Sequence, residues 1–273
     1  MSEVVIKPHS KLALNLGELK TYRELLFYFA WRDIKVRYKQ TAVGAAWAIL
    51  QPFASTVVFT LFFNKVAGIK PDGNIPYPVF AFLGLMFWNL FSASLTKSSN
   101  SIVDNQGVIT KIYFPRLIPP LSSGVIAFMD FCVSTLFFIG LLFLYKITPG
   151  VNGILLLLPM VVVTLLSSLG AGMFFSAVNV KYRDVRQALP FLIQTLMFLT
   201  PVIYPVSLVP ARFQWILYLN PMCGVISLLR NTILGLGRVE PFYLFLSFTS
   251  AIVMFVFGLY YFRYKEKGFA DII

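Results

Sequence analysis

The stretch ILLLLPMVVVTLLSSLGAGMFFSAVNV, residues 154–180, decides the fold class because it contains no charged residue. It is longer than the ~20 apolar residues with which a helix crosses the hydrocarbon of a bilayer. Five more apolar stretches of comparable length lie at residues 44–63, 77–95, 117–145, 188–206 and 242–262. We therefore expect an all-α integral membrane protein with six transmembrane helices.

The composition of the 273-residue chain points the same way. Hydrophobic residues make up 58% of it and charged residues 12%, against about 45–50% and about 25% in soluble domains. One soluble core could not enclose this much apolar surface, so lipid must cover the excess.

The net charge of +12 would suit a nucleic-acid-binding protein, but the basic residues flank the apolar stretches instead of forming one stripe. With the N-terminus in the cytoplasm and six crossings, 17 of the 23 Lys and Arg residues fall on the cytoplasmic side and 6 on the other. The positive-inside rule therefore favours a cytoplasmic location for both termini.

Before the first apolar stretch, residues 1–20 form a polar leader and residues 21–40 are predicted to form an amphipathic helix. Apolar side chains recur on one helical face, namely Phe27, Trp31, Ile34 and Tyr38. Basic side chains group on another face, namely Arg32, Lys35 and Lys39. Such a helix suits the membrane interface, although a solvated helix packed on the protein would show the same pattern. Residues 41–273 then form the transmembrane domain.

The segment 207–238, between the fifth and sixth spans, holds two short apolar pieces at about 210–219 and 222–234. Asn220 and Pro221 between them stop one helix and cap the next. Neither piece can span a bilayer, so we expect two re-entrant helices that enter from outside and return. Two helices lying flat on the surface are the alternative.

The sequence lacks the motifs of an enzyme. It contains no GxxxxGK[ST] phosphate-binding loop, no paired carboxylates within one span and no nucleophile–base set. The two cysteines, Cys132 and Cys223, form no CxxC pair and the single histidine is His9, so neither a disulfide nor a metal site is expected. We expect a non-catalytic chain that binds no cofactor itself.

Asp130 is the only acid well inside an apolar stretch. A carboxylate at membrane depth is costly and is functional by default, or paired. One acid gives thin support for proton coupling, and a hydrogen bond to a hydroxyl such as that of Ser134 is the alternative.

The cytoplasmic segment 100–116 is a candidate docking site for a partner that supplies energy. Its centre mixes polar and apolar side chains at a spacing that a short helix could present: Asp104, Asn105, Gln106, Gly107, Val108, Ile109, Thr110 and Lys111. Any surface helix can show this mixture, so the pattern needs support from elsewhere in the chain.

That support comes from a set of short segments that occur in a characteristic order. They are RYKQT (37–41), Gly44, Trp47, QP (51–52), IYFPR (112–116), NVKYRDVR (179–186), PVIYPV (201–206), LNPM (219–222) and DII (271–273). Together they resemble the membrane subunit of bacterial polysaccharide ABC exporters of the ABC-2 type, over nearly the whole chain beyond residue 20. The O-antigen exporter permease is the most similar member, with the teichoic-acid and capsule exporters as relatives.

The resemblance implies a homodimer of this chain in the bacterial inner membrane, with two copies of a cytoplasmic P-loop ATPase that binds ATP and magnesium. It also implies an interfacial N-terminal helix, a coupling helix within 104–111 and re-entrant gate helices. The implied substrate is a polysaccharide on an undecaprenyl-diphosphate carrier, which moves from the cytoplasmic side outward.

Two groups of residues could handle such a substrate. Arg32, Arg37 and Lys39 form a basic rim that could attract the anionic diphosphate, or they anchor the helix to anionic lipid. A glycan also needs a path with flat faces, and the chain holds 28 Phe, 13 Tyr and 4 Trp. The candidates for this path are Phe53, Trp88 and Tyr204.

Three other functions stay open. A secondary transporter would show inverted repeats or several intramembrane charges, and an enzyme of polyprenyl lipids would show loop clusters of Asp, Glu or His; the sequence shows neither. The third is an ABC-2 exporter of another polymer or lipid, such as teichoic acid or capsule.

Overall fold

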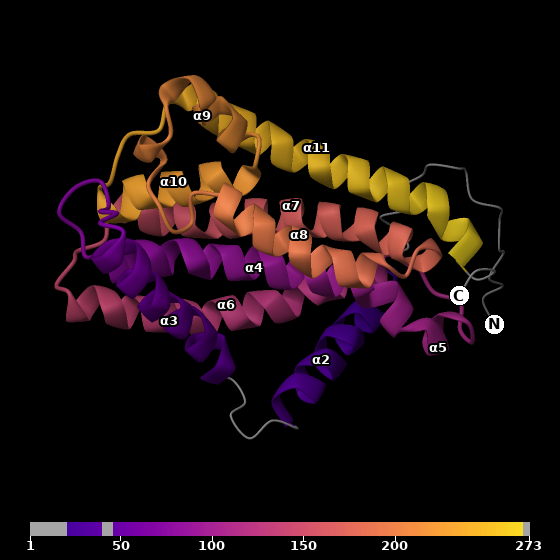
Figure 1. The fold of residues 1–273 in the computed structure, drawn as a ribbon. Coiled ribbons are helices and arrows are strands. Elements are labelled where there is room, and N and C mark those ends of the chain that lie inside the picture. The colour runs from indigo at the N-terminus through magenta and orange to yellow at the C-terminus, as the bar shows by residue number, and fades with distance from the viewer. Residues whose placement is uncertain (1–20, 40–45, 270–273) are drawn as a thin grey trace.

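The computed structural model of the chain describes residues 21–39 and 46–269, and every regular element among them is a helix (Figure 1). The all-α expectation is confirmed for these residues. Five helical stretches here are long and apolar enough to cross a membrane. They are α3 (Trp47–Phe59) continued by the π-helix η2 (Thr60–Val66), α4 (Tyr77–Asp104), α6 (Ile118–Leu144), α7 (Val151–Lys181) and α11 (Pro241–Lys265).

The shorter helices surround these five. They are α2 (Arg23–Lys39), α5 (Gln106–Ile109), α8 (Val185–Leu199), α9 (Ala211–Tyr218) and α10 (Pro221–Leu234), with 3-10 turns at η3 (Val206–Leu208) and η4 (Glu266–Gly268). The two short helices expected within 207–238 are therefore present as α9 and α10. Asn220 caps α10 as predicted, because its side chain accepts a hydrogen bond from the Met222 backbone N–H at 3.0 Å.

The fifth expected span, 188–206, differs most from the prediction. Its helix α8 has 15 residues and ends at Leu199, before Thr200 and Pro201. The proline disfavours a helical conformation in the residue before it, and Thr200 is extended. The remainder of the expected span, from Thr200 to Pro205, is a mostly buried non-helical segment.

Helix α4 is the centre of the bundle (Figure 1). It packs against α7, α6, α3, α10 and α8, and most of its residues between Tyr77 and Leu95 are buried. Small residues allow the closest approaches: a Cβ on Gly172 of α7 would overlap Ser98 of α4, and a Cβ on Gly258 of α11 would overlap the Gly170 carbonyl of α7. Small residues bring helix backbones together in the same way in other membrane proteins.

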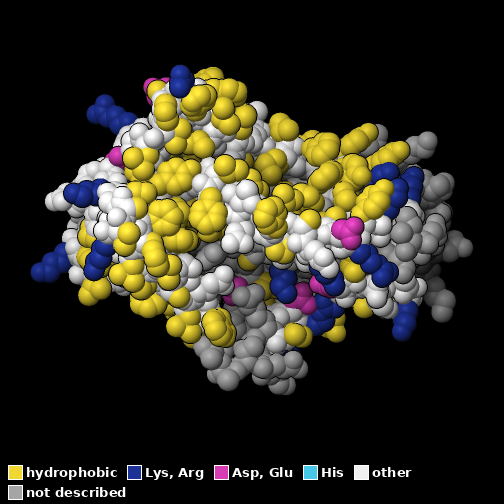
Figure 2. Space-filling model, in the orientation of Figure 1, with side chains coloured by type: hydrophobic (Ala, Val, Ile, Leu, Met, Phe, Trp, Pro, Cys, Tyr) yellow, Lys and Arg dark blue, Asp and Glu magenta, His cyan; other side chains and the backbone are white. Residues whose placement is uncertain are grey.

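The bundle has two distinct ends. At one, here called the α5 end, a cluster joins Phe29 of α2, Ile102, Ile109, Met173 and Phe262. At the other, called the α9 end, the Tyr77 hydroxyl donates to the Ile203 carbonyl at 2.6 Å. Figure 2 shows hydrophobic side chains over the middle of one face, with Lys and Arg gathered toward both ends, which is the distribution of a membrane-spanning protein.

Helix α2 lies at the α5 end, and two of its sides are apolar. Phe29 and Ala30 are buried, with the Phe29 ring 5.6 Å from that of Phe114. Phe27 and Trp31, on the face that the sequence predicted to be apolar, stack on each other and are exposed. One side of α2 therefore packs against the bundle, while the other side leaves these two aromatic rings exposed.

Candidate functional site

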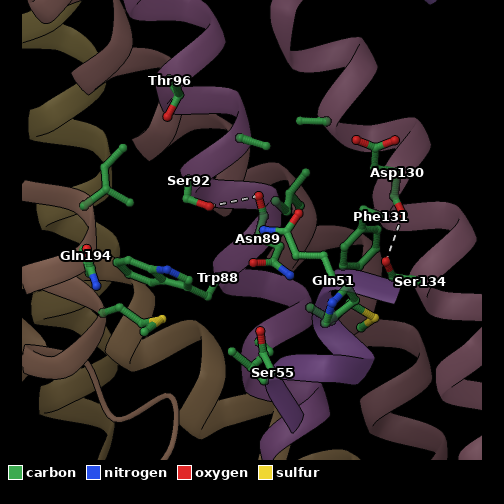
Figure 3. Close-up of a pocket in the computed structure, with 18 of the residues that line it drawn as sticks. Gln51, Ser55, Trp88, Asn89, Ser92, Thr96, Asp130, Phe131, Ser134 and Gln194 are labelled. Atoms are coloured by element: carbon green, nitrogen blue, oxygen red, sulfur yellow. Dashed lines mark hydrogen bonds between the residues drawn. The ribbon is translucent and has the colours of Figure 1, made fainter. Parts of the chain in front are cut away.

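A cavity of about 470 Å³ lies beside α4, between α3, α6 and α8 (Figure 3). Although it sits among apolar spans, its lining is rich in polar side chains: Gln51, Ser55, Asn89, Ser92, Thr96, Lys97, Asp130, Ser134 and Gln194. Trp88, Phe131, Met86 and Met197 add apolar and aromatic surface. Such a combination of polar groups and flat apolar faces can bind a hydroxylated ligand.

The polar lining follows from the spacing of residues on α4. Asn89, Ser92 and Thr96 recur at i, i+3 and i+7, so they share one face of the helix. The rest of α4 is packed against its neighbours, so this face is where the helix meets the cavity. The Ser92 hydroxyl donates to the backbone carbonyl of Asn89 at 3.3 Å, and the side chain of Asn89 lines the cavity (Figure 3).

Asp130 enters the cavity wall from α6 (Figure 3). It is half-buried, and the Ser134 hydroxyl donates to its backbone carbonyl at 3.0 Å. The intramembrane acid that the sequence singled out is thus part of the same polar surface as Asn89 and Gln51.

The three residues predicted for the substrate path do not lie together. Trp88 lines the cavity, although only 3% of it is exposed. Phe53 points elsewhere and packs edge-on against Phe137 at 5.8 Å. Tyr204 lies beyond α8, where its hydroxyl donates to the Leu199 carbonyl at 3.2 Å.

Sequence reasoning selected Asp130 but missed the amide members of the cavity. Gln51, Asn89 and Gln194 each interrupt an apolar stretch, and a polar side chain at membrane depth is usually functional. The three amides could have been selected on this ground, but the candidates were chosen among aromatic side chains and the single acid.

A second cavity, of about 340 Å³, lies at the α5 end between α2, α4 and α6. Arg32, predicted to meet the substrate, lines it with Asp33, Lys97, Ser101 and Asp104. The guanidinium of Arg32 bonds Asp33 at 2.6 Å and lies 4.8 Å from the centre of the Phe29 ring. Because Lys97 lines both cavities, they meet at this lysine. The side chains of Arg37 and Lys39 lie outside the described residues.

The predicted docking segment divides into a buried and an exposed part. Helix α4 extends to Asp104, whose carboxylate bonds Arg186 at 2.5 Å. Asn105 donates to the Ser101 carbonyl at 2.7 Å, and Ile109 is only 6% exposed. The surface of the segment consists of Asp104, Gln106, Gly107, Thr110 and Lys111, with Val108 half-buried.

Within the described residues, no group of three or more His, Cys, Asp or Glu side chains could hold a metal ion. Cys132 is exposed, Cys223 is buried and both are free. His9 lies outside the described residues.

The family comparison decides the class of protein. The family model described as "ABC-2 type transporter" matches residues 24–234. The chain belongs to the ABC-2 type transporter family. The matched range contains both cavities, the α5 segment, α9 and α10, so these elements belong to the family's membrane subunit.

Several curated relatives agree with this family. The O-antigen export system permease protein RfbA of Klebsiella pneumoniae is 28% identical over 96% of this chain and 99% of its own length. The protein of the same name from Myxococcus xanthus is 32% identical over 77% and 80%. The polysialic acid transport protein KpsM of Escherichia coli is 26% identical over 87% and 92%. The resemblance to ABC-2 permeases of polysaccharide exporters is therefore confirmed.

Proposed function

We propose that this ABC-2 permease carries a polysaccharide linked to an undecaprenyl-diphosphate lipid from the cytoplasmic side across the bacterial inner membrane. The observation that carries the proposal is the polar cavity beside α4, which places amides, hydroxyls and the Trp88 ring among apolar spans. Glycans are recognised by hydrogen bonds and flat apolar faces, both of which this lining supplies. Energy comes from ATP hydrolysis on a separate ATPase subunit.

The cavity also supports a homodimer. Gln51 of α3 and Gln194 of α8 line it and are exposed at the surface of the single chain. Amides that face lipid would be costly because they find no hydrogen-bond partners there. A second copy of the chain over α3 and α8 would cover them and enclose a path between the two copies.

Contacts of α8 support six crossings despite its length. Arg186 at its start bonds Asp104 at the end of α4, and Ile203 beyond it bonds Tyr77 at the start of α4. Residues 186–203 therefore run the whole length of α4, whose 28 residues rise about 42 Å. The Lys and Arg count supports a cytoplasmic location for both termini and for the α5 end.

Helices α9 and α10 fit a re-entrant pair. The Ser250 hydroxyl donates to the Leu219 carbonyl at the turn between them, and Ser250 lies about 14 Å along α11 from Pro241. Helix α10 then returns to the α9 end, where the Gly150 N–H bonds the Ile233 carbonyl at 3.1 Å. The turn contacts α11 through Ser250 and the segment after α8 through Asn220, which bonds Thr200 at 2.7 Å. These contacts support the tolerance of non-helical backbone at membrane depth.

Deletion of the gene tests the function. The deletion strain is expected to accumulate finished lipid-linked polymer in the cytoplasm and to lose it from the cell surface, and a plasmid copy should restore export. A normal amount of polymer at the cell surface, with none trapped in the cytoplasm, would contradict the proposal.

Substitutions in the cavity test the path. Asn89→Leu and Gln51→Leu should each lower export at unchanged protein level, because they remove hydrogen-bonding groups from the lining. Val57→Phe changes an exposed apolar position of α3 outside the cavity lining and serves as the control. Equal export by all three variants would argue against a path through this cavity.

The docking proposal concerns Asp104–Lys111 and the ATPase. Gly107 is exposed and a Cβ there meets nothing within 4 Å, so Gly107→Asp should leave the fold intact while weakening co-purification of the ATPase. Ile109 is unsuitable for this test because its burial means that a charged replacement would disturb the chain itself. Undiminished co-purification of Gly107→Asp and Lys111→Glu would place the docking site elsewhere.

A second candidate substrate is a capsule-type polymer. The observation in its favour is the match to KpsM, named a polysialic acid transport protein, over 87% of this chain. Analysis of the sugar and lipid parts of the polymer trapped in the deletion strain distinguishes an O-antigen-like substrate from a capsular one.

A further inference from the structure

A third cavity, of about 360 Å³, lies at the α9 end, away from the polar cavity beside α4. Its walls come from the segment before α4, from residues 205–207, from α9 and α10, and from the start of α11. The volume lies at the lower end of the range of small-molecule sites, about 300–1,000 Å³. We propose that this outer cavity is a binding site for one sugar unit of the exported polymer.

One buried polar atom of a residue in its lining lacks a partner. Arg230 is 4% exposed and its Nε has no hydrogen-bond partner among the described residues. Buried polar atoms are nearly always hydrogen-bonded, and each one left without a partner costs free energy. Ser227, which is 8% exposed, also lines the cavity, with its hydroxyl next to that of Tyr218. A ligand with hydroxyl groups could bond the Arg230 Nε and share the Ser227 hydroxyl.

The rest of the Arg230 guanidinium is firmly fixed. Its Nη1 donates to the Pro201 carbonyl at 2.6 Å, and its Nη2 donates to the carbonyls of Val202 at 2.5 Å and Phe80 at 3.1 Å. The Phe80 ring lies 3.5 Å from the guanidinium carbon. The position of Nε is therefore set in advance, and pre-organised groups bind a ligand at lower entropic cost.

The charges of the lining favour a neutral ligand. It contains two acids, Asp72 and Glu240, and two arginines, Arg230 and Arg238. A phosphate or a lipid headgroup would leave the acids facing a like charge, whereas a polyhydroxylated neutral ring can donate to carboxylates and accept from guanidinium groups. A flat face is also available from the half-buried Tyr243, which lines the cavity and stacks on the buried Tyr218 with ring centroids 4.8 Å apart.

The inference rests on the proposed function, which places the α9 end outside and makes the substrate a glycan. There, the site would hold a sugar unit that has left the membrane-embedded path. This would bias movement of the polymer outward, since a bound unit is less free to slip back.

Binding of polymer fragments to the intact exporter tests the inference. The permease, purified with its ATPase in lipid nanodiscs, is titrated with fragments of one to three repeat units cut from the host's own surface polysaccharide. We expect saturable binding that is weakened roughly three- to tenfold by Ser227→Ala and roughly tenfold or more by Glu240→Gln, since a charged partner bonds more strongly. Ser227→Ala removes a single hydroxyl group and adds no bulk, so it should leave the chain folded.

Ser94→Ala is the matched control. Ser94 of α4 is also a buried serine, but it lies outside the outer cavity. Its loss should leave binding unchanged. Equal binding by wild type, Ser227→Ala and Glu240→Gln would overturn the proposal, and so would displacement of the fragments by inorganic phosphate.

The two proposals fail in different ways. If the deletion strain exports polymer normally, the proposed function is wrong. If the deletion strain traps polymer while the fragments bind all variants alike, the export function stands and only the outer site is wrong.

Discussion

Helices α4 and the α3–η2 stretch are both apolar and both long enough to cross a membrane, yet they occupy opposite environments. In their most apolar windows, 78% of α4 is buried inside the chain and 11% of the α3–η2 stretch is. An apolar helix avoids water, but it can do so equally well by facing lipid or by packing against other helices. Burial within one chain therefore depends on features that composition does not report.

The features that distinguish the two helices are visible in their contacts. Helix α4 has small neighbours, such as Gly172 of α7, that let backbones approach closely, and an arginine that binds its first turns. The α3–η2 stretch contains Pro52 and seven π-helical residues, and its large side chains face outward. The first helix holds the single chain together, while the second offers a surface to lipid or to another copy.

The largest effect should come from removing Arg230, which fixes the start of α4. Arg230→Met leaves the carbonyls of Phe80, Pro201 and Val202 without this donor, so we expect a loss of at least about 3 kcal/mol at about 1 kcal/mol or more each. Thermal unfolding of the detergent-purified protein, followed by tryptophan fluorescence, measures this loss. Arg238→Met, at an exposed arginine, should cost under about 0.5 kcal/mol of stability. Equal losses of stability in the two variants would contradict the importance of the hydrogen bonds that Arg230 donates.

A matched pair of leucines addresses the comparison directly. Leu83 of α4 is 0% exposed and Leu61 of η2 is 45% exposed. Leu83→Ala should destabilise the chain by about 2–5 kcal/mol because it leaves a cavity, whereas Leu61→Ala should cost about 0.5 kcal/mol or less. The same unfolding measurement applies, and similar values for the two variants would remove the distinction between the helices.

Two glycines test whether close packing of helix backbones stabilises the position of α4. Gly172→Ala would place a methyl group against Ser98 of α4, while a Cβ on Gly140 of α6 meets nothing within 4 Å. We expect a loss of about 1–3 kcal/mol at Gly172 and no loss, or a small gain, at Gly140. Unfolding temperatures that fall equally in both variants would show that close approach to α7 does not hold α4.

The smallest effect belongs to the ion pair that joins α4 to α8. Asp104 and Arg186 are about half exposed, so their interaction should contribute about 0–1 kcal/mol. A double-mutant cycle with Asp104→Asn and Arg186→Gln measures it. A coupling well above 1 kcal/mol would mean that the α5 end is held by charge instead of by the cluster around Ile109.

The outline of the fold could be predicted from the sequence. Long apolar stretches located the five described helices that are long and apolar enough to cross a membrane, and Asn220–Pro221 located the boundary between α9 and α10. The end of α8 was missed because 188–206 contains no charged residue, and the segment after Leu199 is held by contacts with Arg230 and Tyr77. Arg230 is 29 residues from Pro201 along the chain, and Tyr77 is 126 residues from Ile203. No local sequence pattern can therefore indicate these contacts.

The candidate site was less predictable than the fold. Asp130 and Trp88 could be selected because a carboxylate in a span and a large ring both stand out. Phe53 was chosen on the same basis as Trp88, but which way a ring points depends on the rotation of its helix against neighbours. The cavity exists because α3, α6 and α8 do not close over α4, which is a property of packing and is absent from any single stretch.

The contact between α7 and α11 has a mechanical consequence. Because the Gly170 carbonyl occupies the space that a side chain on Gly258 would need, neither helix can slide along the other without first separating from it. Arg116, seven residues after Ile109 of α5, donates to the Glu266 carbonyl just beyond α11. That bond joins the segment after α5 to the end of α11, and the close packing of Gly170 on Gly258 joins α11 to α7. Direct contacts therefore run without a break from the α5 end into both long helices.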